Sequence, residues 1–136
     1  MLGGPYAFGS GDWHLSDLLA PLYPAEISGR YDLQPVGVEQ AVQLEPVGTL
    51  AQQIDWTKRP VVLWQHVIKA KPDATVRVTA GGHPVILTRP YGKGQVCFVA
   101  AAPLGDAPPG ETAFWDWPQW PKLMGALIRD LLAAVP

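Results

Sequence analysis

Alternating and continuous apolar residues between positions 74 and 102 predict three β-strands joined by two tight turns. The strands are expected at about 74–79, 84–89 and 95–102. Both turns, Ala80-Gly81-Gly82-His83 and Tyr91-Gly92-Lys93-Gly94, hold glycine where a hairpin needs a positive φ. The run Val96–Ala102 is apolar throughout, which is typical of a strand covered on both faces. Residues 61–70 predict one more strand, so we expect a β-meander over about 61–102.

The C-terminal part of the chain has the three-and-four spacing of an amphipathic helix, at about 118–134. Asp116 is the expected N-cap, because a carboxylate accepts hydrogen bonds from the free N–H groups of a first turn. The apolar stripe is Trp120, Leu123, Met124, Leu127, Ile128, Leu131 and Leu132. This helix would cover one face of the apolar strand, and the sequence holds no second long helix for the other face.

The chain opens with the glycine-rich stretch Met1–Trp13, in which only two residues precede a Gly-Gly-Pro turn. Such a turn normally follows a strand, so the opening strand looks incomplete. We therefore expect a single domain over 1–136 that lacks its N-terminal strand–helix half.

Composition narrows the function classes. The net charge is −2 and no Lys/Arg cluster stands out, so nucleic acid is not an expected partner. A single cysteine excludes an intrachain disulfide and any multi-cysteine metal site. No apolar run reaches transmembrane length, so we expect no membrane insertion by this segment. No cofactor or metal is expected, and composition does not decide the compartment, although we slightly favour the cytoplasm.

The candidate ligand site is the loop Gly9, Ser10, Gly11, Asp12 and Trp13, with His66 and Asp106 as possible neighbours. Glycine-rich loops at the carboxyl end of a strand are common ligand sites in α/β proteins. A phosphate loop does not fit, because Ser10 stands where that motif has lysine. The competing interpretation is a structural turn that packs aromatic side chains.

Other candidate groups have simpler explanations. Cys97 lies inside the apolar strand and is expected to pack in the core. The three histidines, His14, His66 and His83, lack the spacing of a metal site. The cluster Trp115, Trp117 and Trp120 is either an exposed glycan platform or a plug between helix and sheet, and we favour the plug.

Four short motifs resemble class I glutamine-amidotransferase-like domains of unassigned activity. They are the loop Gly3–Gly9 followed by Trp13, the segment Leu18–Pro24, the stretch from Lys71-Pro72-Asp73-Ala74 through Tyr91-Gly92-Lys93-Gly94 to Val99, and Trp117–Pro121 before the last helix. The resemblance implies a flavodoxin-like sandwich whose N-terminal half is absent. True amidotransferases carry a cysteine at a glycine-flanked elbow and a His-x-Glu pair. Neither occurs here, so the resemblance carries over no catalytic residue.

The combined prediction is an α/β fold: a partial flavodoxin-like sandwich with a β-meander and a C-terminal helix. The leading functional hypothesis is a non-catalytic, amidotransferase-like domain of a larger bacterial protein, which binds a small molecule or another protein segment or chain. The enzymatic alternative, a hydrolase with a non-cysteine site, stays open but is less favoured. A carbohydrate-binding module that uses Trp115 and Trp117 is the third hypothesis.

Overall fold

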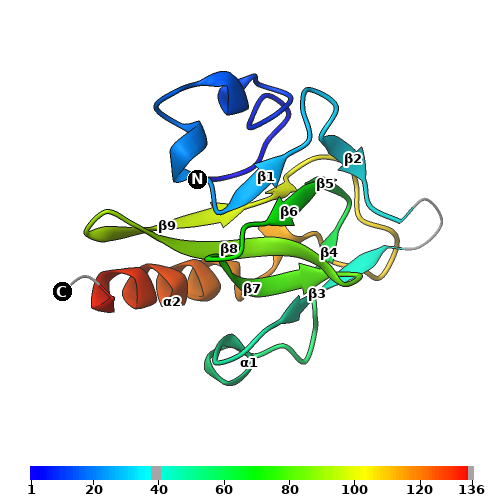
Figure 1. Cartoon of the computed structure of the whole chain (residues 1–136). Coiled ribbons are helices and arrows are strands. Elements are labelled where there is room, and N and C mark those ends of the chain that lie inside the picture. The colour runs from blue at the N-terminus through cyan, green and yellow to red at the C-terminus, as the bar shows by residue number, and fades with distance from the viewer. Residues whose placement is uncertain (38–40, 135–136) are drawn as a thin grey trace.

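The computed structural model describes residues 1–37 and 41–134, and in these residues antiparallel strands dominate (Figure 1). The largest sheet has the order β4-β3-β7-β8-β9, a second has β10-β5-β2, and the third pairs β1 with β6. The strands are β1 Ala25–Ile27, β2 Leu33–Pro35, β3 Val42–Pro46, β4 Val61–Val62, β5 Trp64–His66, β6 Ile68–Ala70, β7 Thr75–Ala80, β8 His83–Tyr91, β9 Gly94–Val99 and β10 Ala101–Ala102.

Helical structure in the described part is limited to one long helix and four short pieces. The α-helices are α1 Leu50–Gln53 and α2 Trp120–Ala133, and the 3₁₀ helices are Trp13–Leu15, Ala20–Leu22 and Phe114–Asp116. None of the helices described is both long enough and apolar enough to cross a bilayer.

Strands β7, β8 and β9 form the expected hairpins. Gly81 and Gly82 have φ angles of 55° and 79° in the first turn, and Gly92 has φ 58° in the second. Turns this short reverse the chain, so the strands that they join must be antiparallel. The register runs from Ala80 opposite His83 in the first hairpin to Tyr91 opposite Gly94 in the second.

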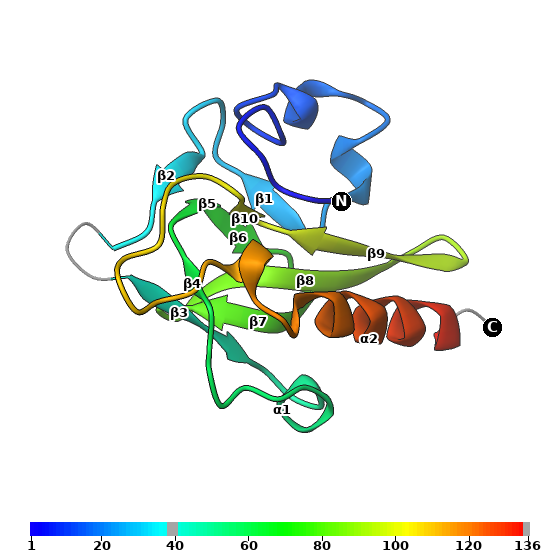
Figure 2. The same cartoon turned by 180° about the vertical axis from the view of Figure 1, so that it is seen from behind.

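The predicted flavodoxin-like α/β sandwich is wrong. That fold needs a parallel sheet with helices on both faces, whereas every pair of named strands here is antiparallel. Parallel pairing in the described residues is limited to two isolated bridges, Leu2 with Val99 and Val61 with Ala113. A single long helix, α2, packs on one side of the large sheet (Figures 1 and 2).

The predicted strand over 61–70 is three short strands with different partners. β4 pairs with β3, β5 lies between β10 and β2, and β6 pairs with β1. The chain therefore passes through all three sheets within ten residues. Apolar residues on both faces of this segment reflect those successive environments rather than one long buried strand.

Both faces of β9 are covered, as its uninterrupted apolar sequence predicts. Val99 belongs to the core cluster that contains Leu123 and Leu127 of α2. Phe98 belongs to a second cluster, where its ring stacks on Phe8 with 4.0 Å between ring centroids. The layer on this second face is formed by N-terminal loops rather than by a helix, and it lies across the sheet from α2 in Figure 1.

Helix α2 begins later than the sequence pattern suggests. Trp117 has extended backbone, with ψ 125°, because the residue before a proline disfavours the α conformation. Asp116 therefore ends a 3₁₀ helix, and Gln119 occupies the N-cap position, so the prediction of Asp116 as N-cap is wrong. At its other end α2 is tied to the sheet by an ion pair between Asp130 and Arg77 of β7.

Candidate functional site

The predicted glycine loop folds around the buried carboxylate of Asp32. The backbone N–H of Gly9 donates to Asp32 Oδ2 at 3.1 Å, and the backbone N–H of Ser10 donates to Oδ1 at 2.8 Å. The Ser10 hydroxyl donates to Oδ1 as well, at 2.8 Å. Asp32 has no solvent exposure. These contacts fix the loop to the β2 region, 22 residues or more along the chain.

His66 completes this group from strand β5. Its Nδ1 lies 2.7 Å from Asp32 Oδ2, and its Nε2 lies 3.2 Å from the backbone carbonyl oxygen of Gly4. Carboxylate and carbonyl oxygens only accept, so each ring nitrogen that carries a hydrogen donates to the oxygen that it faces. The ring is fully buried and makes an edge contact with Phe8 at 4.7 Å between centroids.

Steric constraints hold the loop in this conformation. A Cβ atom on Gly9 would lie 1.9 Å from the carbonyl oxygen of Gly29 and 2.6 Å from Asp32 Cγ. Phe8, just before it, has a φ angle of 51° in the left-handed region, which is unusual for a bulky residue. The hydrogen bonds to Asp32 and the stacking of Phe8 on Phe98 stabilise this strained turn.

The structure brings only part of the predicted site together. Gly9, Ser10 and His66 meet at Asp32, a residue that the sequence analysis did not single out. Asp32 follows a Gly-Arg-Tyr turn, and nothing in its local pattern distinguishes it from a solvated loop aspartate.

The remaining predicted residues lie around this centre or away from it. Asp12 forms an exposed ion pair with Arg30, 2.7 Å from its Nε. Gly11 packs so closely that a Cβ there would lie 2.0 Å from the Tyr6 carbonyl oxygen. Trp13 contacts Phe8 edge-on at 5.7 Å between centroids and is 36% exposed. Asp106 is exposed in the loop after β10, and no hydrogen bond joins it to the described residues of the glycine loop.

The arrangement of Ser10, Asp32 and His66 is not that of a serine hydrolase. A nucleophilic serine hydroxyl bonds to a ring nitrogen of its histidine base, and the carboxylate orients the other nitrogen. Here the Ser10 hydroxyl and His66 Nδ1 both bond to the same carboxylate. With Asp32 and His66 fully buried, this geometry is suited to holding the loop in place.

Trp117 lies in the core, and Trp115 and Trp120 pack against it while partly buried, which favours the plug interpretation. Trp117 is 3% exposed and packs against Trp56, with ring centroids 4.9 Å apart. Trp115 is half-buried and contacts Phe114 edge-on at 5.0 Å. Among the residues that the structure describes, no three His, Cys, Asp or Glu side chains gather as a metal site.

An apolar groove lies on the outer side of β9. Its cavity of about 430 Å³ is lined by Met1, Leu2, Cys97, Val99, Met124, Leu127, Ile128 and Leu131, which together we call the β9–α2 face. Leu2 is 62% exposed and Ile128 is 56% exposed. Burial raises the pKa of the Cys97 thiol above its ordinary value, since the thiolate is poorly solvated there.

Residues 1–3 occupy part of the free edge of β9. The N–H of Val99 donates to the carbonyl oxygen of Met1 at 2.9 Å, and the N–H of Gly3 donates to the Val99 carbonyl oxygen at 2.8 Å. The N-terminal ammonium donates to the Cys97 carbonyl oxygen at 2.7 Å. The bridge is parallel and isolated, and β9 is otherwise the last strand of its sheet.

Comparison with known proteins identifies the fold but no family. No protein-family model matches the chain, and no curated protein matches it. The chain is similar to the solved structure of "Cytoplasmic Protein STM3548 from Salmonella typhimurium", with 19% identity and a TM-score of 0.75 over 96% of this chain and 53% of that one. It is also similar to "Cytoplasmic Protein STM1381 from Salmonella typhimurium LT2", with 18% identity and a TM-score of 0.77 over 96% and 54%. The chain spans about half the length of these two proteins, and at such identity the likeness is one of fold.

Proposed function

We propose that this chain is a non-catalytic interaction domain that binds a companion polypeptide at the β9–α2 face. The observation that carries the proposal is the coincidence of a terminal sheet strand with an exposed apolar groove beside it. Natural proteins usually protect terminal strands, because their unpaired N–H and C=O groups recruit other chains. Contiguous exposed apolar surface likewise marks interaction sites.

The expected mode of binding is addition of a β-strand. Met1–Gly3 already pairs with Val99 and Cys97 in the parallel direction, so an added strand would pair with the part of the β9 edge that these three residues leave open. Side chains of such a strand would reach the groove between β9 and α2, where Leu2 and Ile128 offer apolar contacts.

The comparisons do not identify a companion polypeptide. The two Salmonella proteins are about twice as long as the region that this chain matches. Both are named cytoplasmic, and we propose the same compartment for this chain. A relation to amidotransferase-like domains, and the absence of an N-terminal half, stay predictions that rest on the short motifs given above.

Catalysis is the less favoured function. A hydrolase needs a nucleophile or base that substrate can reach, and Asp32 and His66 are fully buried with their side-chain polar atoms engaged within the chain. A glycan platform is also less favoured, because it would need tryptophan rings in solvent and Trp117 is 3% exposed.

Site-specific photo-crosslinking in the native cell tests the proposed function. A photoreactive residue at position 128 should crosslink to one companion polypeptide, and the substitution Leu2→Asp should reduce the yield. The same residue at position 31 is the control, because Tyr31 is 90% exposed and lies outside the β9–α2 face. Equal crosslinking from both positions, or none from position 128, would contradict the proposal. Crosslinks between two copies of this chain would identify a homodimer instead.

A further inference from the structure

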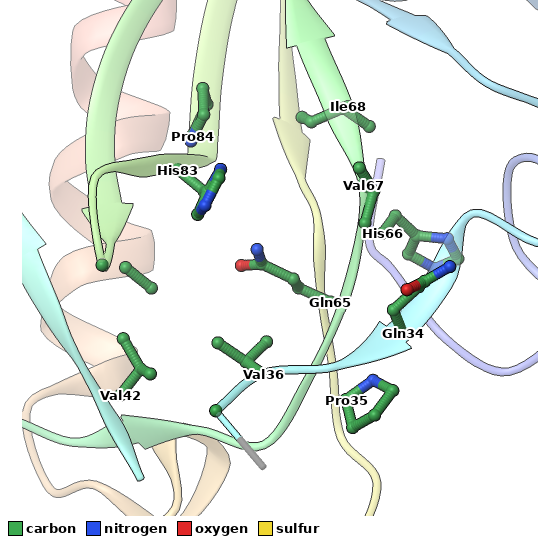
Figure 3. Close-up of a pocket in the computed structure, with 13 residues that line it drawn as sticks. Gln34, Pro35, Val36, Val42, Gln65, His66, Val67, Ile68, His83 and Pro84 are labelled. Atoms are coloured by element: carbon green, nitrogen blue, oxygen red, sulfur yellow. The ribbon is translucent and has the colours of Figure 1, made fainter. Parts of the chain in front are cut away.

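A second cavity lies on a different part of the molecule, between strand β2, strand β5 and the turn from β7 to β8 (Figure 3). Its volume is about 330 Å³, which lies in the range of small-molecule sites. The walls combine apolar side chains, among them Pro35, Val36, Val42 and Pro84, with the polar side chains of Gln34, Gln65 and His83. None of its lining residues belongs to the β9–α2 face.

Gln65 lines this cavity, and its side-chain carbonyl oxygen is unpaired but buried, so a turn of the amide about its terminal bond must bring that oxygen to a ligand. Gln65 is 6% exposed, and its Oε1 is buried without a hydrogen-bond partner among the described residues. Buried polar atoms in folded proteins almost always have a partner, so an exception points to a missing one. The backbone cannot readily move the amide away, because Gln65 pairs with Ala101 of β10 and with Gln34 of β2.

Consecutive residues of β5 face opposite environments. Figure 3 shows the Gln65 amide directed into the cavity toward His83, while the ring of His66 turns away from it. His66 is occupied by Asp32 and the Gly4 carbonyl oxygen, so it is not available to the cavity. His83 is exposed at the cavity rim, at the start of β8.

The lining residues favour an uncharged ligand. Among the described residues that line the cavity there is no Asp, Glu, Lys or Arg side chain, so a charged molecule would lose hydration without gaining a counter-charge from them. A glutamine amide presents an acceptor oxygen beside a donor nitrogen. Its best complement is a ligand edge with an N–H next to a C=O, as in a lactam, a cyclic imide or a pyrimidine base.

We propose that this cavity is a binding site for a small neutral ligand, whose amide-type edge pairs with the side chain of Gln65. The apolar side chains of the walls would contact the rest of such a ligand, and His83 would offer a polar contact at the rim. The site does not depend on the proposed companion polypeptide, so either proposal can fail without the other.

Titration of the isotope-labelled protein by NMR tests this proposal, with uracil and succinimide as probes and 1,3-dimethyluracil as the matched control. Uracil should shift the Gln65 side-chain amide signals and bind saturably at millimolar concentration or below. The dimethyl compound keeps the ring but lacks N–H donors, so it should bind at least about tenfold more weakly. Absence of saturable binding by both probes, or equal binding of the dimethyl compound, overturns the proposal.

Substitution of Gln65 provides a second test of the proposal. Gln65→Met keeps the side-chain length and removes the amide, so uracil binding should fall at least about tenfold while the melting temperature stays equal or rises. Gln53→Met is the control, since Gln53 is exposed on α1 and lies outside the cavity. Unchanged affinity in Gln65→Met overturns the proposal. If that variant fails to fold, His83→Ala takes its place, with a severalfold weaker affinity expected and an unchanged affinity again negative.

Discussion

Removing the Asp32 carboxylate should destabilise the protein more than any surface charge substitution. In Asp32→Ala, the N–H groups of Gly9 and Ser10 and the Nδ1 of His66 lose their acceptor in a place that solvent does not reach. The N-terminal loop would also lose its connection to β2, although Phe8 would still pack on Phe98.

The expected magnitude follows from the burial. Leaving one buried hydrogen-bond donor without its acceptor costs about 1–3 kcal/mol, and Asp32→Ala removes the acceptor of three contacts, so we expect a loss of at least about 3 kcal/mol. That is a large part of the roughly 5–15 kcal/mol by which a domain is stable. At roughly 4 °C per kcal/mol for a chain of this size, the melting temperature should fall by at least about 12 °C.

Urea unfolding followed by tryptophan fluorescence measures this difference. Glu26→Ala is the control, because Glu26 pairs with Lys69 at 3.5 Å on the surface and should change the free energy of unfolding by less than about 0.5 kcal/mol. His66→Ala should cost less in the Asp32→Ala background than in the wild type, since the two residues share one interaction. A change below about 1 kcal/mol in Asp32→Ala would refute the view that this carboxylate holds the loop.

Two further predictions concern the glycine loop and the single thiol. Gly9→Ala should destabilise the protein by about 1–3 kcal/mol, because its Cβ would lie 1.9 Å from the Gly29 carbonyl oxygen. The control Gly4→Ala, whose Cβ would have no heavy atom within 4 Å, should change the free energy of unfolding by less than about 0.5 kcal/mol. Similar values for the two variants would contradict the close packing of the loop around Gly9. Cys97 should react with iodoacetamide at least about tenfold more slowly than glutathione at neutral pH, because burial raises the pKa of its thiol from the ordinary value of 9.0, and unfolding in urea should remove the difference. The same raised pKa favours the folded state below the unfolded-state pKa, so this contribution to stability should be lost as pH rises above about 9.

The hairpins were predictable because their determinants are local. Gly81 and Gly82 adopt the positive φ angles that a two-residue turn requires, and the strands on either side carry β-branched residues. The same turns require antiparallel pairing of the strands that they join. The turn residues alone therefore already argue against the parallel sheet of a flavodoxin-like fold. The sandwich prediction came from short motifs, and those motifs describe turns that several folds share.

The pairing of 61–70 and the role of Asp32 depend on distant residues. Nothing in the sequence of β4, β5 and β6 indicates that their partners are β3, β10 with β2, and β1. Asp32 becomes a buried acceptor only because Gly9, 23 residues before it, and His66, 34 residues after it, fold onto it. Hydrophobic periodicity cannot report a buried polar residue whose partners lie elsewhere in the chain.

Hydrogen-bond satisfaction distinguishes Gln65, which lines a cavity, from the residues of the glycine loop. Gly9, Ser10 and His66 meet at Asp32, and their contacts are completed within the chain, so they stabilise the N-terminal loop over β9. Gln65 precedes His66 and has the opposite property, because its buried oxygen has no partner among the described residues. A ligand gains little binding free energy from polar groups that are already hydrogen-bonded, and more from a buried polar group that has no partner. We therefore propose that ligand contacts are made at Gln65, the residue before His66, and polypeptide contacts at the exposed β9–α2 face.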